Sequence, residues 1–225
     1  MARRYTQPMP APPPAEPHLP ANLTTWANGS MPEDGDELVA VEVRHAQWPG
    51  LAVRDLRLEE AVFDAGDLSG ATLTDVTMRD LVFRDPNLAN AVIRGGSLSR
   101  VEIAGGRLTG LRLPESELRD VVWRNGAADM AAFRHARLHR VMFDGCNLRQ
   151  ADFMGARFEQ VRFQDCDLAG AAFAHARFVD SELRRCRMSG IEGIVGLRGA
   201  AIDLEQVLDL APALAAALGI AVLPD

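Results

Sequence analysis

Residues 131–150 read AAFRH, ARLHR, VMFDG and CNLRQ when they are divided into groups of five. The third residue of each group is Phe or Leu, the first is small or β-branched, and the other three are mostly polar. The same register runs without a break from Val43 to Met188, and Ala128 is its one small third residue. Neither an α-helix nor a β-strand has a period of five. The pattern therefore predicts a backbone that turns once per group and points two side chains of each group inward.

A second period, of twenty residues, gives the number of groups in one full turn. Residues of the same type recur at this interval, for example Val101, Val121, Val141 and Val161, and Cys146, Cys166 and Cys186. In a solenoid, residues on the same side of successive coils stack in columns. Four groups per coil therefore predict an all-β solenoid with four sides over residues 41–190.

Ala128 lies in one of these columns, between Leu108 and Leu148. A small side chain between two leucines leaves volume unfilled unless neighbours move in. We expect a void at this position, and we expect Ala128→Leu to be tolerated or stabilising.

The unbroken register, with Leu or Phe at the third position, resembles the pentapeptide-repeat family over residues 41–190. The resemblance implies a right-handed quadrilateral β-helix. It implies little about activity, although the best-known functional members are bacterial proteins that modulate DNA gyrase and protect against quinolones. Those members act as dimers, joined at their C-terminal ends, that mimic duplex DNA.

Residues 1–40 precede the register and are rich in proline, with seven of the thirteen prolines in the first twenty positions. This composition is typical of polyproline II or disordered chain. We expect a largely disordered tail. The alternative is that Leu23 and Trp26 dock on the shaft.

Residues 191–225 follow the register and are expected to cap the solenoid, because its last coil would otherwise expose the core and an unpaired edge. Ile191, Ile194 and Leu197 indicate a short turn-like lid. Asp203 and Gln206 have the spacing of a capping box, which predicts a helix over 203–218. Pro212 should kink or divide this helix.

The apolar face of this helix has two interpretations. It either covers the last coil or pairs with a second copy of the chain in a homodimer, as the resemblance implies for members that act on gyrase. The residues concerned are Leu204, Val207, Leu208, Leu214 and Leu218.

The sequence shows no catalytic, cofactor-binding or metal-binding motif. All 24 basic residues are arginine, which excludes a Walker A lysine, a Schiff-base lysine and a lysine general base. The three cysteines share one predicted column with no histidine or carboxylate in it, so we interpret them as buried packing rather than a zinc site or a disulfide. We expect a non-enzymatic protein without a cofactor.

The chain has no apolar run long enough to span a membrane and no apolar segment of a secretory signal. We therefore expect a cytoplasmic protein without a membrane partner.

The net charge of −7 comes from the two flanks, because residues 41–190 contain equal numbers of arginines and acidic residues. Duplex DNA presents dense negative charge. A neutral shaft therefore disfavours DNA mimicry, and with it the modulation of gyrase or topoisomerase IV. We expect a protein-interaction or scaffold module, and we do not expect nucleic acid among its partners.

One outward column concentrates positive charge, because three arginines recur at intervals of twenty. Stacked like charges repel unless they are paired, and Glu159 and Asp180 are the nearest candidate partners. The column is either a locally paired surface or a contact site for an acidic partner or a phosphate backbone. The candidate contact residues are Arg134, Arg137, His139, Arg140, Arg157 and Arg177.

Overall fold

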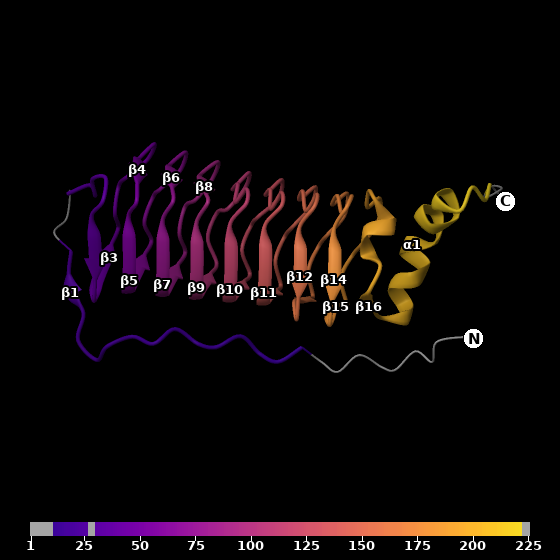
Figure 1. The fold of residues 1–225 in the computed structure, drawn as a ribbon, viewed down its shortest axis with the longest axis horizontal. Helices are drawn as coiled ribbons and strands as arrows, with labels where there is room; N and C mark the ends of the chain where they lie inside the picture. Colours follow the sequence, from indigo (N-terminus) through magenta and orange to yellow (C-terminus); the bar gives the residue numbers. More distant parts are fainter. Residues whose placement is uncertain (1–10, 27–29, 222–225) are drawn as a thin grey trace.

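The computed structural model describes residues 11–26 and 30–221 of the chain. Figure 1 shows an elongated solenoid of stacked coils, closed by a helix at its C-terminal end. Neighbouring coils pair in parallel at an offset of twenty residues, so that Leu118 lies beside Leu138 and Val121 beside Val141. The all-β solenoid and the twenty-residue coil predicted from the sequence are confirmed.

The elements are short because the backbone turns at every fifth residue. They are β1 (Thr24–Thr25), β2 (Glu37–Val39), β3 (Val41–Arg44), β4 (Ala52–Arg54), β5 (Arg57–Asp64), β6 (Thr72–Thr74), β7 (Thr77–Arg84), β8 (Val92–Arg94), β9 (Ser97–Ala104), β10 (Glu117–Arg124), β11 (Arg137–Asp144), β12 (Arg157–Glu159), β13 (Arg162–Gln164), β14 (Arg177–Val179), β15 (Ser181–Arg184), the 3₁₀-helix η1 (Ile194–Leu197), β16 (Ala200–Ile202) and α1 (Leu204–Ala217).

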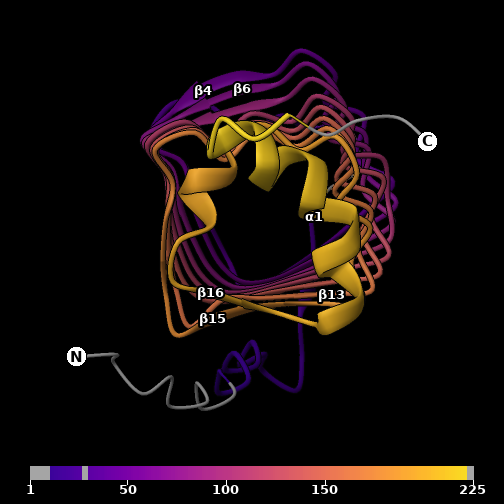
Figure 2. The ribbon, with the colours of Figure 1, turned by 90° about the vertical axis from the view of Figure 1, so that its right-hand side faces the viewer.

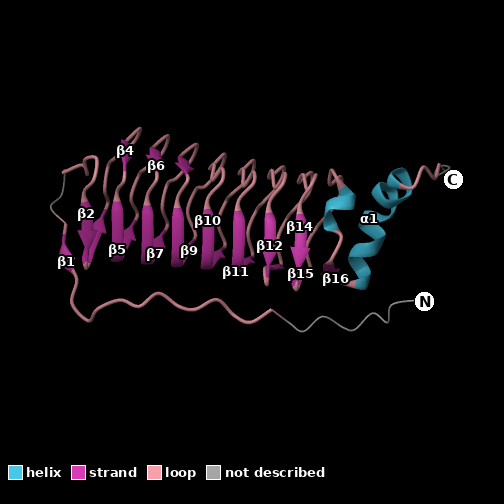
Figure 3. Cartoon of the chain, in the orientation of Figure 1, coloured by secondary structure: helices cyan, strands magenta, loops and turns pink. Residues whose placement is uncertain are grey.

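Each coil has four sides, and Figure 2 looks along the shaft at its four-sided outline. The eight-residue strands β5, β7, β9, β10 and β11 each cover two adjacent sides. Strands β4, β6 and β8 form a separate sheet on a third side. A ladder of single bridges from Gln47 to Arg187 follows the fourth side. Figure 3 shows the strands of the large sheet stacked along the shaft, with loops between them.

The corners take the left-handed backbone conformation even where the residue is not glycine. Glu60, Asp80 and Asp120 have φ values of 53°, 55° and 55°. This conformation costs most residues about 1–2 kcal/mol, and Asn and Asp tolerate it better than other non-glycine residues. Every fifth position is accordingly rich in Gly, Asp and Asn.

The third-position side chains fill the bore, and towards the C-terminal end they are mostly phenylalanines stacked in columns. The ring centroids of Phe143 and Phe163 are 4.8 Å apart, and those of Phe158 and Phe178 are 4.3 Å apart. The three cysteines form a buried column of free thiols beside these stacks, as the twenty-residue spacing predicts.

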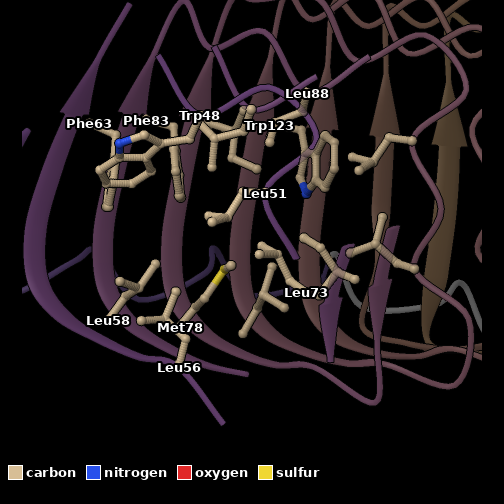
Figure 4. Close-up of a pocket in the computed structure, with 16 residues that line it drawn as sticks. Trp48, Leu51, Leu56, Leu58, Phe63, Leu73, Met78, Phe83, Leu88 and Trp123 are labelled. Atoms are coloured by element: carbon tan, nitrogen blue, oxygen red, sulfur yellow. The ribbon is translucent and has the colours of Figure 1, made fainter. Parts of the chain in front are cut away.

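The bore contains an apolar cavity, but it is not at Ala128. Figure 4 shows the cavity among side chains from Trp48 to Trp123, and Ala128 does not line it. Ala128 is fully buried, and the rings of Trp123 and Phe133 on the two adjacent sides lie 5.8 Å apart, centroid to centroid. The expected void at Ala128 is therefore not part of this cavity, and two large rings flank the residue.

The C-terminal cap follows the sequence prediction closely. The lid is η1, and β16 adds one more parallel strand beside β15. The helix predicted over 203–218 is α1, which continues through Pro212 as one helix. It changes direction midway along its length (Figure 2), so the helix is kinked and not divided. The side-chain oxygen of Gln206 accepts a hydrogen bond from the Asp203 N–H at 2.8 Å, which is one half of the predicted capping box.

The N-terminal flank differs from the largely disordered tail expected over 1–40. Residues 11–26 lie along the outside of the shaft, running from its C-terminal towards its N-terminal end (Figure 1). Strand β1 pairs with β3, β2 pairs with β5, and Trp26 packs against the core. The structure instead shows the alternative, a docked tail, because backbone groups of the tail form hydrogen bonds with the shaft. Residues 1–10 and 27–29 of the predicted tail, and 222–225 of the predicted cap, lie outside the described residues.

Candidate functional site

Three of the six candidate contact residues are neutralised by acidic side chains of neighbouring coils. The pairs are Arg137 with Glu117 at 2.7 Å, Arg140 with Asp120 at 2.6 Å and Arg134 with Asp152 at 2.5 Å. Surface ion pairs of this kind add little stability, but they remove net charge from the surface. The arginine column is therefore less positive than its sequence indicates.

The remaining arginines form a smaller positive surface. Arg157 on β12 and Arg177 on β14 stack in register, and neither makes an ion pair within 11–26 and 30–221. Glu159, one of the two expected acidic partners, lies 3.9 Å from His139 Nε2. A shallow groove of mixed charge, which includes Arg119 and Arg157, follows this side of the shaft.

Helix α1 packs on the shaft through Gln206 and Leu210 and leaves three other leucines exposed. Gln206 and Leu210 are buried, whereas Leu204, Leu208 and Leu218 are 85%, 79% and 74% exposed. The Gln206 amide donates a hydrogen bond to the Cys186 carbonyl of the last complete coil at 3.1 Å.

The interpretation of the helix leucines as a cap is therefore wrong for the three most exposed of them. Gln206 and Leu210, one helical turn apart, are the residues of α1 that are buried against the end of the bore. Val207 and Leu214 are intermediate, at 38% and 39% exposed. The result is an apolar helix face, unpartnered among the described residues, at one end of the rod.

The corner between the two sides of the large sheet carries buried acidic residues. Asp80 and Asp120 are 3% and 4% exposed, and each is held by the arginine twenty residues later, Arg100 or Arg140, through two hydrogen bonds of 2.6 Å. Burial alone would raise the pKa of Asp80, but hydrogen bonds from Arg100 and from the backbone N–H of His18 outweigh it, so the pKa lies below its ordinary value.

Asp120 has the same environment. Burial opposes its ionisation, while Arg140 and the backbone N–H of Ala15 donate hydrogen bonds to it, and its pKa is lowered as well. Both carboxylates therefore stay charged at neutral pH. The sequence analysis did not single out either residue, although their spacing of forty residues places them on one column two coils apart.

The cavity in the bore is not a site for a polar ligand, because apolar side chains line it throughout. Trp123 is one of the lining residues (Figure 4), and its buried indole N–H has no hydrogen-bond partner among residues 11–26 and 30–221. A buried water needs about two to four polar partners. A single donor is too few to hold one.

The cysteine column consists of buried thiols whose pKa values shift in different directions. Hydrogen bonding to Cys166 lowers the pKa of Cys146 and of Cys186. The neighbouring thiols of Cys146 and Cys186, together with burial, raise the pKa of Cys166, so it stays protonated. In the described residues, no group of three or more His, Cys, Asp and Glu side chains is arranged to hold a metal ion. None of the helices described here has the length and apolar character needed to cross a bilayer.

A family model described as "Pentapeptide repeat region" matches residues 97–173 and 136–192. No curated protein matches the chain. Among solved structures, a trypsin-treated form of QnrB1, a plasmid-mediated fluoroquinolone resistance protein, is 18% identical over 85% of this chain and 99% of its own, with a TM-score of 0.48. HetL, a pentapeptide repeat protein involved in heterocyst differentiation regulation from the cyanobacterium Nostoc sp., is 15% identical over 75% of this chain and 87% of its own, with a TM-score of 0.48.

Proposed function

The shaft of this chain is a pentapeptide-repeat solenoid, and from its geometry we propose a non-enzymatic protein-interaction rod that forms a homodimer through the outer face of α1. The observation that carries the proposal is the exposure of Leu204, Leu208 and Leu218 at the end of the rod. Large exposed apolar patches on a soluble protein mark interaction sites. A non-catalytic role agrees with a bore filled by apolar side chains and a surface of paired charges.

A second copy is the occupant that fits this face best. A twofold axis at the rod end would place the same leucines of both copies against each other, and such self-complementary contacts are the commonest way in which proteins dimerise. The contact does not cover the sides of either shaft. We also propose a cytoplasmic location, where the three free thiols would stay reduced.

The test is the mass of the protein in solution, measured by size-exclusion chromatography with light scattering. We expect the wild type to have twice the 24.4 kDa chain mass and the double variant Leu204→Glu, Leu208→Glu to have the chain mass itself. The matched control is Glu205→Gln with Asp209→Asn, on exposed residues of the same helix, and it should remain dimeric. A monomeric wild type at high concentration, or a dimeric double variant, contradicts the proposal.

The charges of the shaft argue against the alternative function, modulation of DNA gyrase or topoisomerase IV by DNA mimicry. Arginines alternate with acidic residues along the corner column that contains Asp80, Arg100, Asp120 and Arg140, so no sustained acidic row forms there. We expect gyrase to supercoil plasmid DNA at an unchanged rate in the presence of this protein. Inhibition at stoichiometric concentrations would favour the alternative instead.

A further inference from the structure

We call the N-terminal segment 11–23 the strap. About one residue in three of the strap packs against the shaft. Ala11 is buried, and Pro14, Pro17, Pro20 and Leu23 are half-buried, whereas most residues between them are exposed. Polyproline II helices have three residues per turn. The strap therefore turns a single face of a polyproline II segment towards the solenoid.

The pitch of the strap matches the spacing of the coils. Three residues of polyproline II rise about 9.3 Å, and two coils span about 9.6 Å. The hydrogen bonds between the strap and the shaft have the same spacing. The N–H of Ala15 donates to Asp120 Oδ1 at 3.0 Å, and the N–H of His18, three residues later, donates to Asp80 Oδ1 at 2.9 Å, two coils away.

Three residues nearer the N-terminus, the hydrogen-bond donor belongs to the shaft instead of the strap. The next residue of the series is Pro12, which has no N–H, and there the side chain of Arg162 donates to the carbonyl of Ala11 at 2.9 Å. The strap is thus recognised through backbone groups at a fixed interval. Recognition of this kind specifies a backbone shape and a spacing rather than one sequence.

The side of the shaft that carries β5, β7, β9, β10 and β11 has an outer row with four apolar residues. We call this row, together with Asp80 and Asp120, the strap groove. Its apolar members are Val62, Val82, Val122 and Met142, all at outward positions and all buried or half-buried. Glu102 of β9, which pairs with Arg124 at 3.5 Å, interrupts them between Val82 and Val122. The equivalent row on the adjacent side, from Arg57 to Arg177, contains no apolar residue. An apolar row that points outward needs a cover.

The two acidic residues of the groove are held in place independently of the strap. Each accepts two hydrogen bonds from its arginine, so its carboxylate remains fixed and charged when the strap leaves. A preorganised acceptor loses less conformational freedom when it binds a ligand. The groove therefore has the character of a binding surface rather than of a simple intramolecular contact.

We propose that the strap groove binds polyproline II segments, that residues 11–23 occupy it in cis, and that a proline-rich segment of a partner protein binds there by displacing the strap. The partner segment carries an apolar residue at every third position and free N–H groups three residues apart. The strap lies outside the coils, so its release leaves the parallel pairing of the shaft intact. This surface is separate from α1 and does not depend on the dimer.

A labelled peptide with the sequence of residues 11–23 tests the groove directly. The strap of the full chain is loosened by Pro14→Gly, Pro17→Gly and Pro20→Gly, which removes the rings that face the shaft. The matched control is Pro12→Gly with Pro13→Gly, which changes two exposed prolines of the same strap. Fluorescence anisotropy measures peptide binding, and circular dichroism confirms that each variant is folded.

We expect the loosened variant to bind the peptide at least about tenfold more tightly than the wild type or the control, because the groove is no longer occupied in cis. Adding Asp80→Asn and Asp120→Asn to the loosened variant should weaken that binding, as should replacing the three facing prolines of the peptide with glycine. Equal binding by the loosened variant and the control overturns the proposal. So does binding that is insensitive to both Asn substitutions in a folded variant.

Discussion

At the scale of single residues, arginines and acidic side chains are matched across coils at a separation of twenty. Arg185 binds Asp165 through two hydrogen bonds of 2.6 and 2.8 Å, and Arg137 binds Glu117 at 2.7 Å. The twenty-residue columns seen in the sequence already place these pairs side by side. The partners Glu159 and Asp180 were instead predicted from nearness in sequence, and neither forms an ion pair with an arginine in the part of the chain that the structure describes.

Ala128 gives a prediction at this scale. The rings of Trp123 and Phe133 lie on the two adjacent sides of the coil, so we expect a larger side chain to crowd them. We expect Ala128→Leu to lower the free energy of unfolding by about 1–3 kcal/mol, as over-packed cores do. Urea denaturation at pH 7 measures this.

Leu148→Met, in the next coil of the same column, is the control for Ala128→Leu, because it conserves volume and should cost less than about 1.5 kcal/mol. A stabilised Ala128→Leu variant would show that unfilled volume is present after all.

At the scale of elements, the strap is the part of the fold that sequence reasoning missed. Its composition was recognised, but composition does not show that Pro14, Pro17, Pro20 and Leu23 form one face. The three-residue period of the strap indicates docking only when its rise is compared with the spacing of two coils. The hydrogen-bond acceptors Asp80 and Asp120 are also far from the strap in sequence. The cap was predictable because its signals, Asp203 and Gln206, are local.

The strap contacts predict a dependence of stability on pH. Asp80 and Asp120 have pKa values below the ordinary 3.8 in the folded chain, so their contribution to stability is present above pH 3.8 and is lost as the pH falls through the lower, folded values. Arg79 and Arg100 face Asp80, and both remain charged throughout this range. We expect wild type and the Asp80→Asn, Asp120→Asn variant to differ in unfolding free energy at pH 5, and the difference to shrink as the pH falls below 3.8.

Urea denaturation at several pH values measures this difference in unfolding free energy. A difference that stayed constant down to pH 2 would contradict the assigned ion pairs.

Gly196 in η1 gives a second prediction for an element. A Cβ at this position would lie 1.8 Å from the carbonyl oxygen of Phe173, so η1 cannot stay seated on the last coil if the residue has a side chain. We expect Gly196→Ala to lower the melting temperature and to expose the end of the bore to a hydrophobic dye. Gly66→Ala is the matched control, because its Cβ would meet only ordinary contacts of 3.5 Å or more. Equal melting temperatures for the two variants would contradict this account of the lid.

At the scale of the whole molecule, the shaft is a neutral rod whose two ends differ. The sequence predicted the solenoid, its coil and its neutral charge, because all three follow from a period that repeats along the chain. It left open whether α1 caps the coil or pairs with a second chain, because both uses require an apolar helix. In the structure, Gln206 and Leu210 pack on the coil, while Leu204 and Leu208 point away from it and are the residues of the proposed dimer contact.

This division makes a prediction about the shape of the dimer. The exposed leucines lie at the end of the rod, so two copies joined there extend away from each other instead of lying side by side. We expect small-angle X-ray scattering to give the wild type a maximum dimension close to twice that of the Leu204→Glu, Leu208→Glu monomer. A dimer that is hardly longer than the monomer would place the contact on a side of the shaft. Arg157 and Arg177, which make no ion pair with any described residue, would then be the first residues to change. In the end-to-end dimer neither strap groove is covered by the second copy, so release of both straps would present two identical peptide-binding surfaces at a fixed separation. A partner that carries two proline-rich segments would then bind more tightly than one with a single segment, because its second contact forms at a high effective concentration.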